Sequence, residues 1–367
     1  MVLIILFFTI NAIPSVLGKT RRLYLIDFIL DTEIEGFGFS NAIIDLDILD
    51  TDEKKEEAVS FEATAYALSI LNDFGVDPKE IETLEGKLED RITEMFASKQ
   101  VNIYNLYYLL NSLNILQYTI DSSLSNRIYG FLNDTAQESG GFSFSNTTHL
   151  STLSSTFYVI QLYSLIEQPI GNISVHKNWV LSCNNTDGGY GGNQTLSSTY
   201  LETCFAVFIL DDERFGSVND LVDINKTITY LTTFYVSNPV DLDNYGGYIP
   251  DELAEFALLT STYYCAKAIS LIDKNALNVH ETRSWVLAHQ NVEDGGFSEN
   301  SASSQSKVSS VISSYYAFKT LEVIESLYYL NYDVWMVEFN YGILGIVIGS
   351  IGLVIVIAIV LWRRRRI

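Results

Sequence analysis

The chain has 367 residues, of which 45 are acidic and 22 basic, so its formal net charge at pH 7 is −23. Apart from a C-terminal arginine cluster no segment is basic. This excludes nucleic acid as a partner, because binding to nucleic acid requires clustered Lys and Arg. The three cysteines, Cys183, Cys204 and Cys265, exclude a disulfide-rich scaffold, although one bridge between two of them stays open. The length suits one large helical domain or two ordinary ones.

The first segment, residues 1–18, has the pattern of a signal peptide. An apolar run from Val2 to Ile13 is followed by small residues and then by Lys19, as expected around a cleavage site. The alternative is an N-terminal anchor that is not cleaved. Residues 19–54 form an acidic N-terminal segment that contains Gly36-Phe37-Gly38-Phe39, a degenerate copy of the repeat that follows.

A repeat of about fifty residues organises the rest of the chain. A Gly-Gly-aromatic element recurs at Gly140-Gly141-Phe142, Gly188-Gly189-Tyr190, Gly246-Gly247-Tyr248 and Gly295-Gly296-Phe297. Each copy follows a helix-like stretch and precedes a second one that begins with Ser or Thr and an aromatic residue. Because paired glycines can adopt positive φ, we expect each pair to end one helix and redirect the chain into the next.

The second helix of each unit is apolar on nearly all sides, as residues 157–166 and 204–210 illustrate. A helix of this kind must be covered on more than one face. Stacked units with one layer of helices inside another would provide that cover. The sequence therefore predicts an all-α fold built from repeated helical hairpins.

Six N-x-S/T sequons lie between the two ends of the chain, and glycosylation there would require export of this region. The candidate residues are Asn133, Asn146, Asn172, Asn184, Asn193 and Asn225. We therefore expect the region to lie outside the cell.

The C-terminal part is predicted to be a stalk at residues 328–341, a transmembrane helix at 342–362 and a basic cytoplasmic tail at 363–367. Residues 342–362 carry no charge, and a helix of that length spans roughly 30 Å, the thickness of a bilayer core. The four arginines that follow belong on the cytoplasmic side. These features predict a single-pass protein of the plasma membrane. Gly345 and Gly349 form a G-x-x-x-G pair that would allow a homodimer of the spans.

The motifs around the later repeats resemble those of protein prenyltransferase β subunits and of squalene and terpene cyclases. The matching residues are Trp285-Val286-Leu287 with Gln290, Asp294-Gly295-Gly296-Phe297, and Ser313-Ser314-Tyr315-Tyr316-Ala317. The resemblance implies an α/α toroid of five to six helical hairpins over residues 55–327, with inner helices around a central cavity and outer helices encircling them. The same toroid also serves non-enzymatic proteins.

The catalytic motifs of that family are incomplete. Its prenyltransferases bind zinc through Asp-x-Cys at the start of one inner helix and a His at the like position of a later one. The nearest match is Glu202-Thr203-Cys204, and no histidine stands at the like positions. We therefore expect no metal or cofactor, with zinc at Glu202 and Cys204 only if the protein is an enzyme. The acidic clusters at residues 45–47 and 50–53, which are compared with the catalytic acids of cyclases, are interpreted as a solvated loop.

Two classes of function follow from the resemblance. The first is a non-catalytic, membrane-anchored binding or interaction module at the cell surface, whose cavity takes an apolar or glycan-like ligand. The alternative is a prenyltransferase-like or terpene-cyclase-like enzyme that acts on an isoprenoid or lipid. Under the first reading the cavity would be lined by Tyr158, Tyr263, Tyr264, Tyr315 and Tyr316, since aromatic walls offer large apolar faces with a polar tip. The same tyrosines could also serve only to pack the centre of the toroid.

Overall fold

The computed structural model describes residues 19–299 and 308–333. Contacts divide the chain into two units, a large one at Leu23–Tyr329 and a small one formed by the residues on either side of it. In the small unit Thr20 pairs antiparallel with Asp333. The predicted signal peptide, the transmembrane span at 342–362, the tail at 363–367 and the Gly345–Gly349 pair lie outside the described residues. Within the described ranges no helix is both long and apolar enough to cross a membrane.

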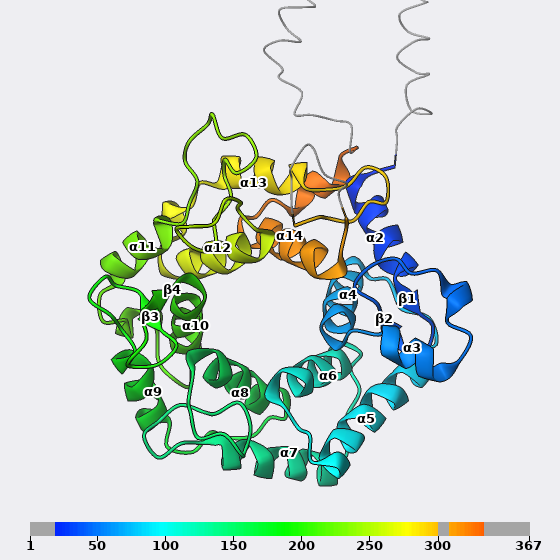
Figure 1. Ribbon diagram of the computed structural model, residues 1–367, viewed down its shortest axis with the longest axis horizontal. Coiled ribbons are helices and arrows are strands. Elements are labelled where there is room, and N and C mark those ends of the chain that lie inside the picture. Colours follow the sequence, from blue (N-terminus) through cyan, green and yellow to red (C-terminus); the bar gives the residue numbers. More distant parts are fainter. Residues whose placement is uncertain (1–18, 300–307, 334–367) are drawn as a thin grey trace, which may run out of the picture. The chain divides into compact units, whose positions relative to one another are not determined.

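Six inner helices form a ring in the large unit (Figure 1). They are α4 (Phe61–Phe74), α6 (Ile103–Ile115), α8 (Leu153–Leu165), α10 (Tyr200–Asp211), α12 (Leu259–Asp273) and α14 (Val311–Val323). Each inner helix packs against the next, and α14 packs against α4, which closes the ring. The predicted α/α toroid is therefore confirmed, with six hairpins in the described part of the chain.

Outer helices precede the inner ones along the chain and lie outside them (Figure 1). They are α2 (Arg21–Asp31), α5 (Ile81–Ser98), α7 (Ser122–Thr135), α9 (Ile173–Ser182), α11 (Ile224–Thr232) and α13 (Val279–Ala288). A short helix α3 (Asp52–Ala58) and four 3-10 turns, η2 (Leu46–Ile48), η3 (Val218–Asp220), η4 (Lys274–Ala276) and η5 (Leu327–Asn331), complete the helical elements of the described chain. Two short antiparallel pairs, β1 (Glu33–Ile34) with β2 (Gly38–Phe39) and β3 (Tyr190–Gly191) with β4 (Ser198–Thr199), lie in the connecting loops.

The repeated Ser or Thr of the sequence holds each glycine turn onto its inner helix. The backbone N–H of Tyr190, the aromatic residue after a glycine pair, donates to Oγ1 of Thr203 at 2.9 Å. The same bond recurs from Phe39 to Thr64, Phe142 to Thr156, Tyr248 to Thr262 and Phe297 to Ser314. Each acceptor is the fourth residue of its inner helix. The Ser/Thr signal in the repeat is therefore a hydrogen-bonding position, buried between the two helical layers.

The second glycine of each pair packs against an aromatic ring on the next outer helix. A Cβ added at Gly141 would lie 2.8 Å from Trp179, at Gly189 2.7 Å from Tyr230, and at Gly247 2.7 Å from Trp285. The glycine is required because any side chain would meet the ring. In the last repeat the ring is that of Phe28 on α2, and a Cβ at Gly296 would lie 2.8 Å from it.

The N-terminal helix α2 thus occupies the outer position that follows α13 and completes the circle. The loop after α2 also reaches the last inner helix, since the N–H of Val311 donates to the carbonyl of Asn41 at 2.9 Å. The sequence analysis predicted that residues 19–54 form a separate acidic segment and that the toroid begins at residue 55. In the structure the large unit begins at Leu23, and the segment supplies the outer helix of the first hairpin.

Candidate functional site

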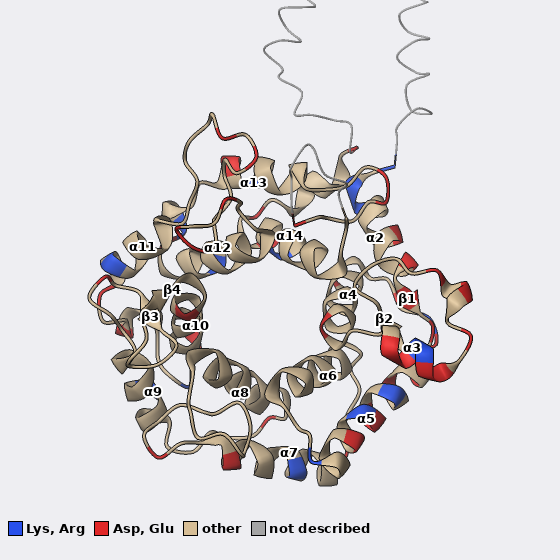
Figure 2. Ribbon diagram, viewed as in Figure 1, with Lys and Arg blue, Asp and Glu red and all other residues tan. Residues whose placement is uncertain are grey.

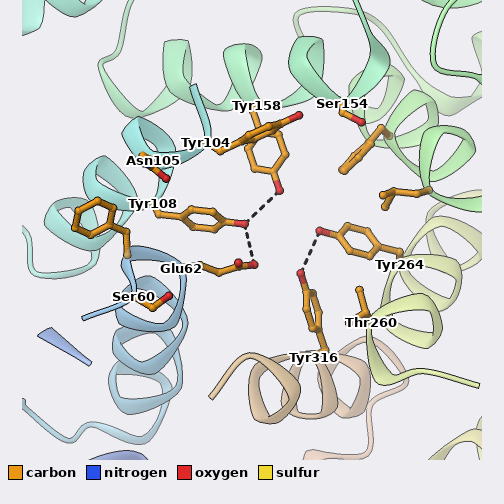
Figure 3. A pocket seen from close by; sticks show the side chains of 13 residues that line it. Ser60, Glu62, Tyr104, Asn105, Tyr108, Ser154, Tyr158, Thr260, Tyr264 and Tyr316 are labelled. Atoms are coloured by element: carbon orange, nitrogen blue, oxygen red, sulfur yellow. Dashed lines mark hydrogen bonds between the residues drawn. The ribbon is translucent and has the colours of Figure 1, made fainter. Parts of the chain in front are cut away.

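A cavity of about 510 Å³ opens among the inner helices (Figure 3). Ser60, Tyr104, Ser154, Leu201 and Thr260, among its lining residues, are caps or first-turn residues of α4, α6, α8, α10 and α12. The N-termini of these five helices therefore meet at one end of the ring. The full lining comprises Ser60, Phe61, Glu62, Tyr104, Asn105, Tyr108, Ser154, Tyr158, Leu201, Phe205, Thr260, Tyr264 and Tyr316.

The inner end of the cavity borders a closed belt of six aromatic side chains, here called the aromatic belt, and five of the six line the cavity. Its members are the sixth residues of the six inner helices: Tyr66, Tyr108, Tyr158, Phe205, Tyr264 and Tyr316. Each ring lies against the next around the circle, with centroid separations from 5.5 to 6.3 Å. All six side chains are buried. Because the inner helices begin at the same end, equal offsets along the chain place these rings at the same depth.

The five hydroxyl groups of the belt form one hydrogen-bonded network with Glu62. The hydroxyl of Tyr108 donates to Oε1 of Glu62 at 2.9 Å, as Figure 3 shows. Tyr108 also meets the hydroxyls of Tyr158 at 3.4 Å and Tyr66 at 3.5 Å. The hydroxyl of Tyr316 lies 3.0 Å from that of Tyr66 and 3.4 Å from that of Tyr264, so it connects the two. The polar tips of the belt therefore converge on a single carboxyl group.

Burial raises the pKa of Glu62, and hydrogen bonds from Tyr108 and Tyr66 oppose that shift. No Lys, Arg or His is among the thirteen lining residues, and no ion pair joins Glu62 within the described chain. Burial also raises the pKa of the belt tyrosines, so their phenols stay protonated at neutral pH. The cavity thus combines aromatic walls with one acidic group that has no counter-ion, an arrangement typical of functional sites.

The predicted wall tyrosines divide into two sets. Tyr158, Tyr264 and Tyr316 line the cavity. Tyr263 and Tyr315, which the sequence also assigned to the wall, are absent from it. The ring of Tyr315 stacks on that of Tyr66 with centroids 3.7 Å apart, and Tyr263 packs against Tyr316 at 5.5 Å. Each of the two is the fifth residue of its helix, so it points about 100° away from the belt position.

Glu202 and Cys204 have separate structural roles. The carboxylate of Glu202 accepts hydrogen bonds from N–H and Oγ of Ser154, at 3.0 and 2.7 Å. It therefore caps the neighbouring helix α8, as a carboxylate at a helix N-terminus does favourably. Cys204 is fully buried against Cys265 on α12, and burial raises the pKa of its thiol. The two residues do not form a joint site.

Among the residues that the structure describes, no three or more His, Cys, Asp or Glu side chains lie together in a way that could hold a metal ion. The four histidines lie away from the cavity. His176 stacks on Phe142 in the outer layer, and His289 follows α13, where its Nδ1 lies 2.8 Å from the carbonyl of Trp285. The acidic residues at 45, 47, 50, 52 and 53 are exposed, and Asp45 caps the short turn η2.

The sequon asparagines differ in exposure. Asn133, Asn146, Asn172 and Asn225 are exposed, whereas Asn184 and Asn193 are half-buried. The amide nitrogen of Asn184 donates to the carbonyl of Gly189 at 3.3 Å, so a glycan on it would alter this glycine turn. Glycosylation at all six remains a prediction.

Sequence reasoning missed Glu62, Tyr66, Tyr108 and Phe205 as members of the site. The signal that could have found the belt is the equal offset of its residues from each inner-helix start. That signal requires the helix starts, which Ser60, Asn102, Thr152, Thr199 and Ser310 mark as N-cap residues.

Comparisons with known proteins agree with this architecture. The family model for the prenyltransferase alpha-alpha toroid domain matches residues 76–231 and 248–337, and the chain belongs to this family. Among solved structures it is similar to protein geranylgeranyltransferase-I from Candida albicans complexed with GGPP, with 14% identity, a TM-score of 0.56, and 80% of this chain and 92% of that chain covered. It is also similar to a type II terpene cyclase from Scytonema in complex with merosterolic acid A, with 12% identity, a TM-score of 0.48, and coverages of 84% and 95%. A search of curated proteins gives no match.

Proposed function

We propose that this protein is a non-catalytic binding module that holds a small amphipathic ligand in its aromatic cavity. The observation that carries the proposal is the aromatic belt with Glu62 above it. Aromatic faces bury the apolar body of a ligand, while phenol and carboxyl oxygens fix its polar group. A cavity of about 510 Å³ lies within the usual range for small-molecule sites.

The lining residues argue against a diphosphate substrate such as the GGPP bound by the Candida albicans enzyme. Recognition of a diphosphate relies on Arg or Lys, and the cavity wall offers neither. The capping carboxylate of Glu202 also occupies the helix N-terminus at Ser154, a position that would otherwise attract an anion.

Anchoring at the cell surface forms part of the proposal and rests on the sequence alone. The uncharged stretch at 342–362, the arginines after it and the six sequons support a toroid held outside the plasma membrane by one span. A bilayer and a second copy paired through Gly345 and Gly349 are the partners that this arrangement would offer.

The alternative, an enzyme of the cyclase type, is favoured by one observation. Glu62 is an acid whose pKa burial raises, and it faces a cavity with aromatic walls. A protonated carboxyl in such a place could deliver a proton to an isoprenoid. The hydrogen bond from Tyr108 stabilises the ionised form instead and weakens Glu62 as an acid.

Both functions can be tested on the purified full chain in detergent. We expect calorimetric binding of 2-(1-naphthyl)ethanol, a neutral probe with an aromatic body and one hydroxyl. Ser154→Trp, which fills the cavity mouth, should abolish it, and Val175→Trp on the exposed face of α9 should not. The Ser154→Trp protein in the same detergent also corrects for partition of the probe into micelles.

Geranylgeranyl diphosphate should neither bind nor be converted. Specific binding of this diphosphate, or any product from it or from squalene, would overturn the non-catalytic proposal. Equal heats from the native chain and from Ser154→Trp would show that the cavity does not take the neutral probe.

A further inference from the structure

The directions of the hydrogen bonds in the aromatic belt follow from a count of protons. An ionised Glu62 can only accept, so Tyr108 donates to it. Its proton is then used, so Tyr158 must donate to Tyr108, and Tyr66 donates either to Tyr108 or to Glu62 itself. The same logic makes Tyr316 donate to Tyr66 and Tyr264 donate to Tyr316.

Every phenolic proton of the belt is thereby directed toward the Glu62 carboxylate. The belt offers a ligand its ring faces, its oxygen lone pairs and the carboxylate, but no proton donor. A ligand that complements such a surface must donate hydrogen bonds. Aromatic faces also attract positive charge through their quadrupole.

The loops around the cavity mouth also favour a positively charged ligand. We call the segments that join each outer helix to the next inner helix the mouth loops: residues 32–60, 99–102, 136–152, 183–199, 233–258 and 289–310. On their described parts Lys54, Lys55 and Lys99 are the only Lys or Arg side chains, against many Asp and Glu. Figure 2 shows acidic residues on the loops around α3 and α13, while the inner helices carry few charges. A field of one sign at a mouth raises the local concentration of the opposite charge.

The helix N-termini at the mouth do not reverse this preference. Their positive ends would attract anions, but side chains already occupy them. Glu202 caps α8 through Ser154. Glu299 accepts from the N–H of Thr260 on α12 at 3.1 Å and from Oγ of Ser313 on α14 at 3.0 Å. Carboxylates of the protein have thus taken the places that an anionic ligand would use.

We infer that the ligand of this cavity is an organic cation, a protonated amine on an apolar body, whose ammonium group donates to Glu62 above the aromatic belt. This inference rests on the proposed function and names the chemical class of its ligand. A protonated amine supplies a counter-ion to the Glu62 carboxylate and hydrogen-bond donors to the acceptors of the belt. Its positive charge is also attracted by the acidic mouth loops.

The test compares two probes of the same shape, 2-(1-naphthyl)ethylamine and 2-(1-naphthyl)ethanol, by calorimetry on the full chain in detergent at pH 7. A hydrogen bond to a charged group makes the amine bind about 10- to 100-fold more tightly than the alcohol. The anionic analogue 3-(1-naphthyl)propionate is rejected. In Glu62→Gln the preference for the amine falls to about parity. In Glu255→Gln, which removes an equal charge from an exposed position on a mouth loop, it is kept.

Binding of the alcohol reports separately on the cavity, because it requires no charge on Glu62. A far-ultraviolet circular dichroism spectrum like that of the native chain, with a Tm no lower, shows that Glu62→Gln is folded. If the alcohol binds and the amine binds no better, or if the amine preference survives in Glu62→Gln, the inference of a cationic ligand is wrong and the binding function stands. If neither probe binds, the proposed function fails and the inference fails with it.

Discussion

Closure of the ring by α2 can be tested at the contact between Gly296 and Phe28. A Cβ added at Gly296 would lie 2.8 Å from two ring atoms of Phe28 and 2.7 Å from Cβ of Ser309. Phe28 is 1% exposed, so the ring has little room to move away. Gly296→Ala should therefore destabilise the fold by about 1–3 kcal/mol, the usual effect of overpacking.

A second substitution separates this clash from a general effect of alanine. Phe28→Leu removes the ring atoms nearest to Gly296 and should itself cost about 1 kcal/mol. If α2 packs on the last glycine turn, the double variant should be more stable than the sum of the two losses predicts, by about 1 kcal/mol. Urea unfolding of the full chain, followed by far-ultraviolet circular dichroism, measures all four proteins.

Gly171→Ala provides the matched control, because a Cβ there would meet no atom within 4 Å. Its free energy of unfolding should stay within about 0.5 kcal/mol of the native value. Strictly additive losses for Gly296→Ala and Phe28→Leu would refute the placement of α2 beside the last repeat.

Three further outcomes are expected. Thr203→Val removes the acceptor of the buried Tyr190 N–H and should cost about 1–3 kcal/mol in the same urea assay; Thr229→Val on exposed α11 should not. Because the pKa of Glu62 is raised by burial, its ionisation lowers stability as pH rises above about 4.5. Glu62→Gln should therefore raise Tm at pH 7 more than at pH 4. A larger rise at pH 4 than at pH 7 would contradict the upward shift of the pKa. The groups that face Glu62 stay neutral in this pH range; they are Tyr66, Tyr108, Tyr158 and Tyr316. Metal analysis by mass spectrometry should give the same zinc content for Cys204→Ser and the native chain, and stoichiometric zinc lost in Cys204→Ser would establish a metal site.

The fold could be predicted because its signal is repeated and physically strict. The second glycine of each pair packs against an aromatic ring such as that of Trp179 or Trp285, so a larger residue does not fit there. Each Ser or Thr accepts a hydrogen bond from a buried backbone N–H. The glycine element of the first repeat was predicted as a degenerate copy, but its outer helix α2 was missed, because α2 carries Phe28 where α9, α11 and α13 have Trp or Tyr. Its partner in the structure, Gly296, also lies at the far end of the sequence, where no local pattern can reveal it.

The site was predicted only in part, for a reason of helix geometry. Adjacent residues on a helix point about 100° apart, so a Tyr-Tyr pair such as Tyr263-Tyr264 does not reveal which ring faces the centre. Glu62 has no sequence signal of its own, because a Glu in the first turn of a helix is common as a dipole-stabilising residue. Its distinction comes from burial beside Tyr108, which depends on the next hairpin.

The closure of the ring between its first and last helices also constrains how the chain can fold. Four of the five glycine turns meet a partner that is made soon before or after them, so most hairpins can dock in order of synthesis. Helix α2, in contrast, is made before the other helices that the structure describes, and its aromatic contact forms only when Gly296 has been made. Closing a loop of this length is costly in chain entropy and slow. Until the last hairpin has been made, the apolar face of α2, which includes Leu25, Phe28 and Ile29, cannot pack against its native partner. A chain arrested before that point would therefore expose an apolar, aggregation-prone surface on α2.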